Sequence, residues 1–387
     1  MADISVIMQF LTGHKYLKLN NHKLGQALGC HIKYRYPMID GCCAKVNWKA
    51  LQKLAGHPAV KVIWHDKMVK AVLDISTPVV NAPPVWNFGF RGNGVGIAVI
   101  DTGIYPHPDL TTPVNRIIAF RDFVGRRTRP YDDNGHGTHV AGDAAGNGAR
   151  SDGLFTGPAP MANLIGVKVL NRNGSGFLST VLAGIQWCID NKANFNIRVI
   201  NLSLGATATQ SCQFDPLCQA VGAAWQAGIV VCAAAGNSGP GSGTIITPGI
   251  NPNIVTVGAD DTKRTIPVTD DTIAGFSSRG PTLDGVTKPD VVAPGVNVIS
   301  LRSPRSTLDR TRPGLRVGNW YFRLSGTSMA TPICAGVTSL LIQMNPGISP
   351  DIIKNALKST ARNIGNNPPN IQGSGLIDAL AAIQSAI

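Results

Sequence analysis

The chain has 387 residues and a formal net charge of +13, and 43% of its residues are hydrophobic while 15% are charged. This composition predicts a globular protein with one large core and room for a small second domain. All 22 acidic residues are Asp, and the absence of Glu excludes HExxH metalloproteases, Glu general bases and Glu-dependent serine proteases of the sedolisin kind. Acid–base chemistry must therefore use Asp, His, Cys, Lys or Tyr.

The basic excess is concentrated at the N-terminal end of the chain. Residues 1–73 hold eleven Lys and Arg against three Asp, which places +8 of the net charge of +13 there. No aromatic platforms or repeats accompany these charges, so we interpret them as a solvated face and expect no nucleic-acid partner.

The location of the protein is predicted from what the sequence lacks. Residues 1–23 show no cleavable signal pattern, and no apolar run reaches membrane-spanning length. We therefore expect a cytoplasmic protein without membrane contact, with export by another route as the alternative. A cytoplasmic location predicts that the 8 Cys are reduced thiols, whereas an exported protein would pair Cys212 with Cys218 in a small disulfide loop.

The first 73 residues predict a compact α+β unit. Strand-like segments lie at 4–11, 31–39, 44–46 and 60–64, helix-like segments lie at 21–28 and 48–54, and an open tail follows at 66–73. Residues 74–84 contain three Pro and predict an extended linker.

The pattern changes from residue 95 onward, where short apolar strands alternate with helices. The segments that carry the alternation are 96–100, 163–170, 181–190, 199–205, 218–228, 229–236 and 254–259. Continuous apolar strands between helices predict a doubly wound α/β domain, in which helices cover both faces of a mostly parallel sheet.

Four polar side chains lie where predicted strands end or predicted helices begin. Asp101 and Asn237 directly follow apolar strands, and His136 and Ser328 each open an apolar helix. Because functional groups of such sheets gather at the carboxyl ends of the strands, we expect these four residues to lie together.

Ser328 has two interpretations when it is taken alone. It falls at or just before the start of the helix predicted at 330–341, where Pro332 is tolerated and where Ser is a preferred N-cap. For an isolated Ser the cap is the favoured interpretation. The same position also presents free amides and the positive end of the helix dipole to a developing negative charge.

The four side chains match the needs of a nucleophilic serine. A Ser hydroxyl attacks only when a His takes its proton, and an Asp fixes the tautomer of that His and stabilises its charged form. A side-chain amide and a backbone amide can bind the oxyanion of the tetrahedral intermediate. Asp101, His136, Ser328 and Asn237 supply these groups, with the Ser328 N–H as the second oxyanion donor.

The segments VIDTGI, HGTHVAG, AAAGNSG and SGTSMATP resemble the four signature blocks of the subtilisin-like serine proteases, and their Asp, His, Ser order is that of the family. The resemblance extends from about Val85 to Ile387 and is strongest to the intracellular, AprX-like branch. It implies a serine endopeptidase that works through an acyl-enzyme and needs no cofactor for its chemistry. An N-cap would explain only one of the four blocks.

Residues 1–73 resemble the inhibitory propeptide of this family. The resemblance implies a precursor, expected to be a monomer, that is inhibited by its own propeptide and cuts itself between Leu73 and Asp74. Residues 74–94 would then be the linker and the start of the mature chain, and residues 95–387 the catalytic domain.

Substrate-binding residues follow from the resemblance position by position. It implies that an extended peptide pairs with two edges and that its residue before the cut enters a pocket. The edges are Gly174, Ser175 and Gly176 on one side and Ser203, Leu204 and Gly205 on the other. The pocket has Ala233, Ala234 and Gly236 as one wall and Ile246 at its base, which predicts a shallow apolar pocket for a medium side chain such as Leu.

Other features are less informative. Calcium is uncertain, because Asp152 is the one carboxylate in the usual loop, with Asp132 and Asp133 as a weaker alternative. His107 and His139 match structural positions, and Asp143 departs from the apolar residue usual in the family.

Six arginines, Arg302, Arg305, Arg310, Arg312, Arg316 and Arg323, lie in a loop that is either solvated or selective for acidic substrates. The alternative function is a catalytically silent scaffold that captures peptides, against which the intact set of four residues argues.

Overall fold

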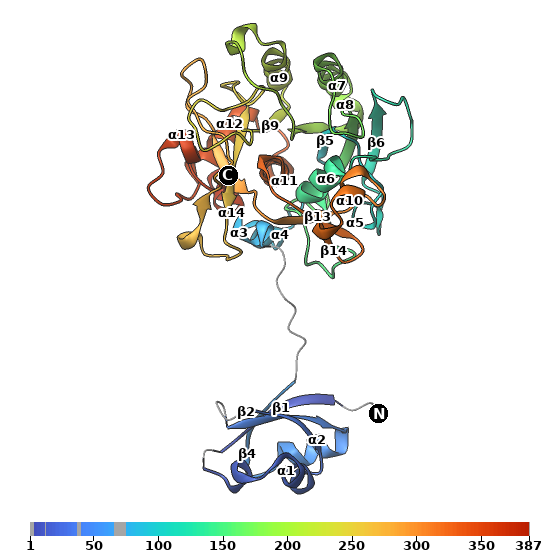
Figure 1. Ribbon diagram of the computed structural model, residues 1–387, viewed down its shortest axis with the longest axis vertical. Coiled ribbons are helices and arrows are strands. Elements are labelled where there is room, and N and C mark those ends of the chain that lie inside the picture. The colour runs from blue at the N-terminus through green and yellow to red at the C-terminus, as the bar shows by residue number, and fades with distance from the viewer. Residues whose placement is uncertain (1–3, 12, 37–39, 66–74, 387) are drawn as a thin grey trace. The chain divides into compact units, whose positions relative to one another are not determined.

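The computed structural model describes residues 4–11, 13–36, 40–65 and 75–386 (Figure 1). The chain divides into two compact units, Met1–Ala71 and Val72–Ile387, which are described separately. In the described part of the chain, no helix is both long and apolar enough to cross a membrane.

The first unit is a four-stranded antiparallel sheet with two helices, which confirms the predicted α+β unit. Its strand order is β2-β3-β1-β4. The elements are β1 (Ile4–Phe10), η1 (Lys15–Lys18), α1 (Asn21–Leu28), β2 (His31–Tyr36), β3 (Gly41–Val46), α2 (Trp48–Ala55) and β4 (Val60–His65). Both helices begin at a side-chain cap, since Asn20 accepts from the Lys23 N–H and Asn47 from the Ala50 N–H. Met8, Phe10 and Leu24 are fully or almost fully buried in its core.

The second unit is built on an eight-stranded sheet in the order β11-β10-β9-β8-β5-β7-β6, with β12 beside β10. Its strands are β5 (Gly96–Asp101), β6 (Ile117–Asp122), β7 (Asn163–Lys168), β8 (Ile197–Leu202), β9 (Val230–Ala234), β10 (Val255–Asp261), β11 (Thr272–Ile273) and β12 (Val291–Pro294). All the pairings are parallel except that of β11 with β10. The predicted mostly parallel sheet is confirmed.

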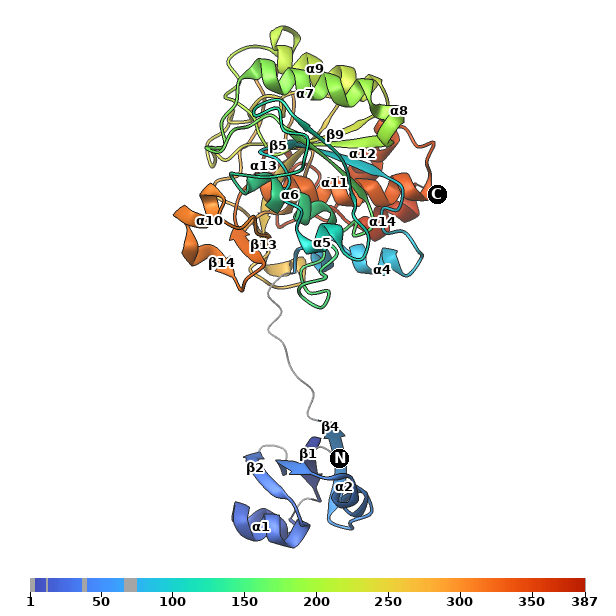
Figure 2. The ribbon, with the colours of Figure 1, turned by 90° about the vertical axis from the view of Figure 1, so that its right-hand side faces the viewer.

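Helices cover both faces of this sheet (Figure 2). One face carries α7 (Leu178–Asp190), α8 (Lys192–Phe195) and α9 (Pro216–Gln226). The other carries α6 (His136–Ala145) and α11 (Thr327–Met344), with α14 (Ala379–Ser385) packed on α11. Further short elements of this unit are α5 (Pro108–Thr111), η3 (Cys212–Phe214), η4 (Val268–Asp270), α12 (Pro350–Ser359) and α13 (Pro369–Gln372).

Helices α6 and α11 pack closely because a glycine lies between them. A Cβ added to Gly336 of α11 would come within 2.6 Å of the Ala144 carbonyl oxygen of α6. The close contact brings the first turns of these two helices to the same edge of the sheet, and these turns hold His136 and Ser328.

The segment predicted as an extended linker is folded instead. It forms α3 (Ser76–Val79) and α4 (Ala82–Trp86), and Val79, Val80 and Val85 are fully buried in the core of the second unit. The Ala379 N–H also donates to the Val80 carbonyl. The prediction gave too much weight to the three Pro and too little to the apolar residues between them.

A small antiparallel sheet precedes α11, and the sequence analysis did not predict it. It consists of β13 (Val298–Leu301), β14 (Arg316–Val317) and β15 (Tyr321–Leu324) in the order β13-β15-β14. Between β13 and β14 lie α10 (Thr307–Thr311) and η5 (Pro313–Leu315).

The cysteines differ in part from the expectation of reduced thiols. Cys212 and Cys218 form a disulfide, which was the less favoured alternative. It closes the loop before α9, whose N-cap Asp215 accepts from the Cys218 N–H. The other six Cys, all within the described part of the chain, are not in disulfides.

Candidate active site

The four predicted side chains come to the carboxyl edge of the large sheet. Asp101 is the last residue of β5, Asn237 follows β9, His136 is the first residue of α6 and Ser328 is the second residue of α11. The strand that carries Asp101 is rigidly held, since Ile97, Val99 and Ile100 are fully buried and each such side chain contributes about 1.5–3 kcal/mol.

Asp101 and His136 form a close pair. The Nδ1 atom of His136 lies 2.8 Å from Oδ1 and 3.0 Å from Oδ2 of Asp101. The Asp101 side chain is 0% exposed, whereas that of His136 is 23% exposed. The acid is therefore sealed behind the imidazole, whose outer edge reaches the solvent.

The surroundings of His136 favour its charged form. Burial acts against the imidazolium, but the charge and hydrogen bond of Asp101, and more weakly the charges of Asp132 and Asp143, raise the pKa of His136 above its ordinary value. The first turn of α6 is also bound to the residue that follows β5, because the Gly137 N–H donates to the Thr102 hydroxyl at 2.8 Å.

Ser328 lies inside the first turn of α11 and does not cap it. The N-cap is Gly326, and it makes no side-chain capping bond. The Ser328 hydroxyl donates to the Ser203 carbonyl at 3.1 Å. The N-cap interpretation of Ser328 is therefore wrong.

Pro332 lies four residues after Ser328 and removes one hydrogen bond from α11. The segment that follows β8 supplies a donor in its place. A proline has no N–H for the carbonyl four residues earlier, which here is that of Ser328. The Ser203 hydroxyl donates to that carbonyl at 2.8 Å. Ser203 and Ser328 are thus joined by two hydrogen bonds, and α11 is fixed to the segment that follows β8.

Asn237 is held by its carbonyl oxygen. Its Oδ1 accepts from the Thr327 N–H at 2.9 Å and from the Thr327 hydroxyl at 3.1 Å. The residue is exposed. Since the acceptor side of the amide is used by Thr327, its Nδ2 donor group is left for a ligand beside Ser328.

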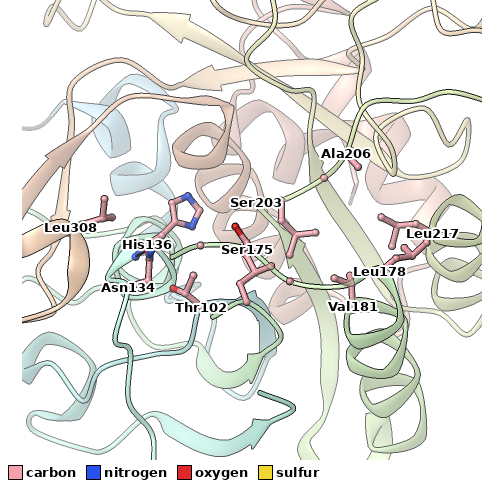
Figure 3. Close-up of a pocket in the computed structure, with 15 residues that line it drawn as sticks. Thr102, Asn134, His136, Ser175, Leu178, Val181, Ser203, Ala206, Leu217 and Leu308 are labelled. Carbon is pink, nitrogen blue, oxygen red and sulfur yellow. Dashed lines mark hydrogen bonds between the residues drawn. The ribbon is translucent and has the colours of Figure 1, made fainter. Parts of the chain in front are cut away.

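A cavity of about 500 Å³ extends from His136 between two segments of the chain (Figure 3). Six predicted substrate-binding residues line it: Gly174, Ser175 and Gly176 on one segment, and Ser203, Leu204 and Gly205 on the other. Leu178, Val181 and Leu217 line the end away from His136, and Leu308 lines the end beside it.

Ile246 lies at the place predicted for the base of the pocket that takes the residue before the cut. Ile246 lies between Gly205 and Gly236, because Cβ atoms added to these glycines would come within 2.6 Å of Ile246 Cδ1 and 2.8 Å of its Cγ2. Ala233 and Ala234 are buried beside them. None of these three non-glycine residues lines the large cavity.

The sequence analysis missed Leu308, Leu178, Val181 and Leu217 as lining residues. Leu308 lies two residues after Ser306, and Ser306 with Asp309 forms a Ser-x-x-Asp cap pattern that could have predicted α10. The other three residues lie on faces of α7 and α9 that become visible only when these helices are placed on the sheet.

Leu73 and Asp74 lie outside the described residues. Among the described residues, no group of three or more His, Cys, Asp or Glu side chains is placed to hold a metal ion. Asp132 accepts from protein donors at both oxygens, among them the Thr102 and Thr138 hydroxyls, and Asp133 pairs with Lys168 at 2.8 Å.

His107 and His139 have structural partners. His107 Nδ1 accepts from the Asp109 N–H at 3.1 Å, and its Nε2 lies 3.0 Å from the Trp320 carbonyl. His139 Nδ1 lies 2.9 Å from Asp143 Oδ2, and its Nε2 lies 3.0 Å from the Phe322 carbonyl. The unexplained Asp143 is therefore the partner of a buried histidine.

The arrangement defines a class of protein: a serine hydrolase on a doubly wound α/β sheet, with a serine, a histidine–aspartate pair and an amide donor at the end of an extended cleft. Residues 92–375 match the sequence model of the subtilase family. The chain belongs to this family and is a serine protease that acts on peptides or proteins.

Individual relatives agree with this assignment. The chain is 48% identical over 386 residues to the serine protease AprX of Bacillus subtilis (strain 168), which covers 97% of this chain and 87% of that protein. It is 42% identical over 303 residues to subtilisin Savinase of Lederbergia lenta, which covers 78% of this chain and 96% of that protein. It is 40% identical over 355 residues to an alkaline protease of Shouchella clausii, and the match covers 91% of this chain and 81% of that protein.

Proposed function

We propose that Ser328, His136 and Asp101 hydrolyse peptide bonds through an acyl-enzyme. The observation that carries the proposal is the His136–Asp101 pair at 2.8 Å, beside the first turn of α11. Ser328 Oγ attacks the carbonyl carbon while His136 Nε2 takes its proton, and His136 then gives that proton to the leaving amine. Water completes the cycle by the same route. Asn237 Nδ2 and the Ser328 N–H hold the oxyanion.

The hydrogen bond from Ser328 to Ser203 suggests how substrate activates the nucleophile. In the free protein the hydroxyl donates to the Ser203 carbonyl. A peptide that pairs with residues 203–205 supplies its own N–H to that edge, and the hydroxyl then turns to His136. Side chains and one backbone N–H carry out every step, so the proposed chemistry needs no cofactor.

The substrate is an extended peptide held between residues 174–176 and 203–205. The position of Ile246 between Gly205 and Gly236 supports a preference for a medium apolar residue such as Leu before the cut, in a shallow pocket.

The protein is made as a monomeric precursor that cuts itself near Leu73, after which the first unit inhibits the second. The division of the chain into two compact units, Met1–Ala71 and Val72–Ile387, supports this proposal.

Intact mass followed over time tests the function and the self-processing together. We expect the wild-type protein to split into fragments near 1–73 and 74–387, and the Ser328→Ala variant to stay whole. The mature enzyme should react with a fluorophosphonate at Ser328. A correctly split protein that resists the fluorophosphonate would favour the silent scaffold, and equal cutting of both proteins would mean that another protease processes the chain.

A further inference from the structure

Residues 302–320, which connect β13 to β15, fold into a lobe beside the cleft. We call this segment the 302–320 lobe. It contains α10, η5 and β14. Three of its residues donate to the segment directly before His136, since the Ser303 hydroxyl bonds the Asp132 carbonyl at 2.7 Å, the Thr307 N–H bonds the Asp133 carbonyl at 2.9 Å and the Leu308 N–H bonds the Asn134 carbonyl at 2.9 Å.

The lobe can approach this closely because residue 135 is a glycine. A Cβ on Gly135 would come within 2.6 Å of the Ser306 hydroxyl oxygen, and within 3.6 Å of Leu308 Cβ. Gly135 also has a φ of +106°, which other residues rarely adopt. The residue next to His136 thus leaves room for α10 against the catalytic segment.

The lobe is braced internally by one buried carboxylate. Asp309, whose side chain is 3% exposed, accepts from Arg302 Nε at 2.6 Å, from Arg316 Nε at 2.7 Å and from the Arg305 N–H at 2.8 Å. Burial opposes its charge, yet these hydrogen bonds hold the pKa of Asp309 at about 2. Such charge-assisted bonds are about twice as strong as neutral ones.

This bracing gives a structural role to two of the six arginines whose role the sequence left open. Arg302 and Arg316 both form ion pairs with Asp309 and so stabilise α10. Because their charges are paired within the lobe, we expect neither to select acidic substrates. What the braced lobe presents to the cleft is apolar. Leu308, the residue before Asp309, is partly buried and lines the cavity on the side of His136, away from Leu178 and Leu217 (Figure 3).

We propose that Leu308 determines specificity for the side chain of the second substrate residue before the cut. Side chains of an extended peptide alternate between faces. The residue before the cut points toward Ile246, so the preceding side chain points the opposite way, toward His136 and Leu308. This inference rests on the binding mode proposed above and adds a residue from the 302–320 lobe to it.

The test is a set of peptides that differ only in the second residue before the cut, with Leu or Gly there. The measured quantity is the ratio of kcat/KM for the Leu peptide to that for the Gly peptide. In Leu308→Ala this ratio should fall about threefold to tenfold, since a few methylene contacts in a half-open site are lost. Arg310→Ala is the matched control, because Arg310 is exposed on the same short helix, and its ratio should equal that of the wild type.

A variant that gains a new preference cannot be explained by misfolding, so it complements the loss expected in Leu308→Ala. Leu308→Asp should reverse the preference toward peptides with Lys or Arg at the same position, because a carboxylate would stand where the apolar wall was. Asp309→Asn, which weakens the bracing, should lower the Leu-to-Gly ratio as Leu308→Ala does.

The result that overturns the proposal is an unchanged ratio in a Leu308→Ala protein that reacts normally with a fluorophosphonate. A change seen only when the residue after the cut is varied would overturn it equally. If the mature wild type itself fails to react, the catalytic proposal fails and this one falls with it.

Discussion

Two histidines that lie one turn apart on α6 each pair with an aspartate, and the two pairs differ in what surrounds them. The His136–Asp101 pair has an imidazole that is 23% exposed to the cleft, whereas both side chains of the His139–Asp143 pair are at most 1% exposed. The distances are almost the same, 2.8 Å and 2.9 Å. The distance within the pair therefore does not distinguish the catalytic histidine from the structural one. The difference is that one ring nitrogen of His136 is accessible to the substrate.

The buried pair has a different task. Both ring nitrogens of His139 face oxygen atoms, one on Asp143 and one on the Phe322 carbonyl. The Ser300 hydroxyl also donates to the His139 carbonyl at 2.8 Å. These contacts fix α6 to β13 and β15, and so they hold the helix that carries His136.

Asp101→Asn should have the largest effect on catalysis. The amide cannot accept the Nδ1 proton as the carboxylate does, so His136 takes the wrong tautomer and kcat should fall about 10⁴-fold. Steady-state kinetics on a peptide substrate measures this, and the unfolding midpoint should move little. A loss of less than tenfold would show that Asp101 is not the partner His136 needs.

Asp143→Ala should have the opposite profile. Removing one partner of a buried pair leaves His139 unsatisfied, and the free energy of unfolding should fall by about 3 kcal/mol. Denaturant titration of the Ser328→Ala background measures this without self-digestion. In the active background, kcat per fluorophosphonate-reactive site should stay within about tenfold of the wild type. If kcat fell as much as in Asp101→Asn, the His139–Asp143 pair would take part in catalysis and would not be purely structural.

The sequence predicted the large sheet and the placement of Asp101, His136, Asn237 and Ser328 because these depend on local patterns. Apolar strands followed by polar residues indicate where a parallel sheet ends. The role of Asp143 was also within reach, since it lies four residues after His139 and therefore on the same side of a helix.

The packing of the 302–320 lobe against the segment before His136, the packing of α3 and α4 into the core, and the position of Leu308 at the end of the cavity could not be predicted in this way. Their positions depend on contacts between distant residues, such as that of Leu308 with Asn134 and that of Val80 with Ala379. A single sequence carries no signal for such contacts.

Asp260 is a further buried aspartate, but it faces another carboxyl group where Asp101 and Asp143 each face a histidine. Asp260 is 0% exposed and faces Asp271, which is 7% exposed. Among the described residues, no N–H or hydroxyl donor reaches any of the four carboxyl oxygens. Burial and the neighbouring Asp271 raise the pKa of Asp260, and burial also raises the pKa of Asp271, so the two carboxyl groups titrate as a coupled pair.

The raised pKa values predict how the free energy of unfolding changes with pH. This is the smallest effect that we predict. Above the ordinary pKa of Asp the unfolded chain releases protons that the folded pair retains, so the pair costs stability as the pH rises from about 4. Asp260→Asn can donate to Asp271 without titrating, and it should raise the free energy of unfolding by about 1 kcal/mol at pH 8 and by less at pH 5.

Denaturant titrations of the Ser328→Ala background at several pH values measure this difference. Asp190→Asn, on the exposed side of α7, is the control and should show no such trend. Charged groups near the pair, Asp261, Lys263, Asp270 and Arg362, remain in every variant. If Asp260→Asn were instead destabilising and most so at high pH, Asp260 would be an ionised group with a cationic partner, as Asp309 is.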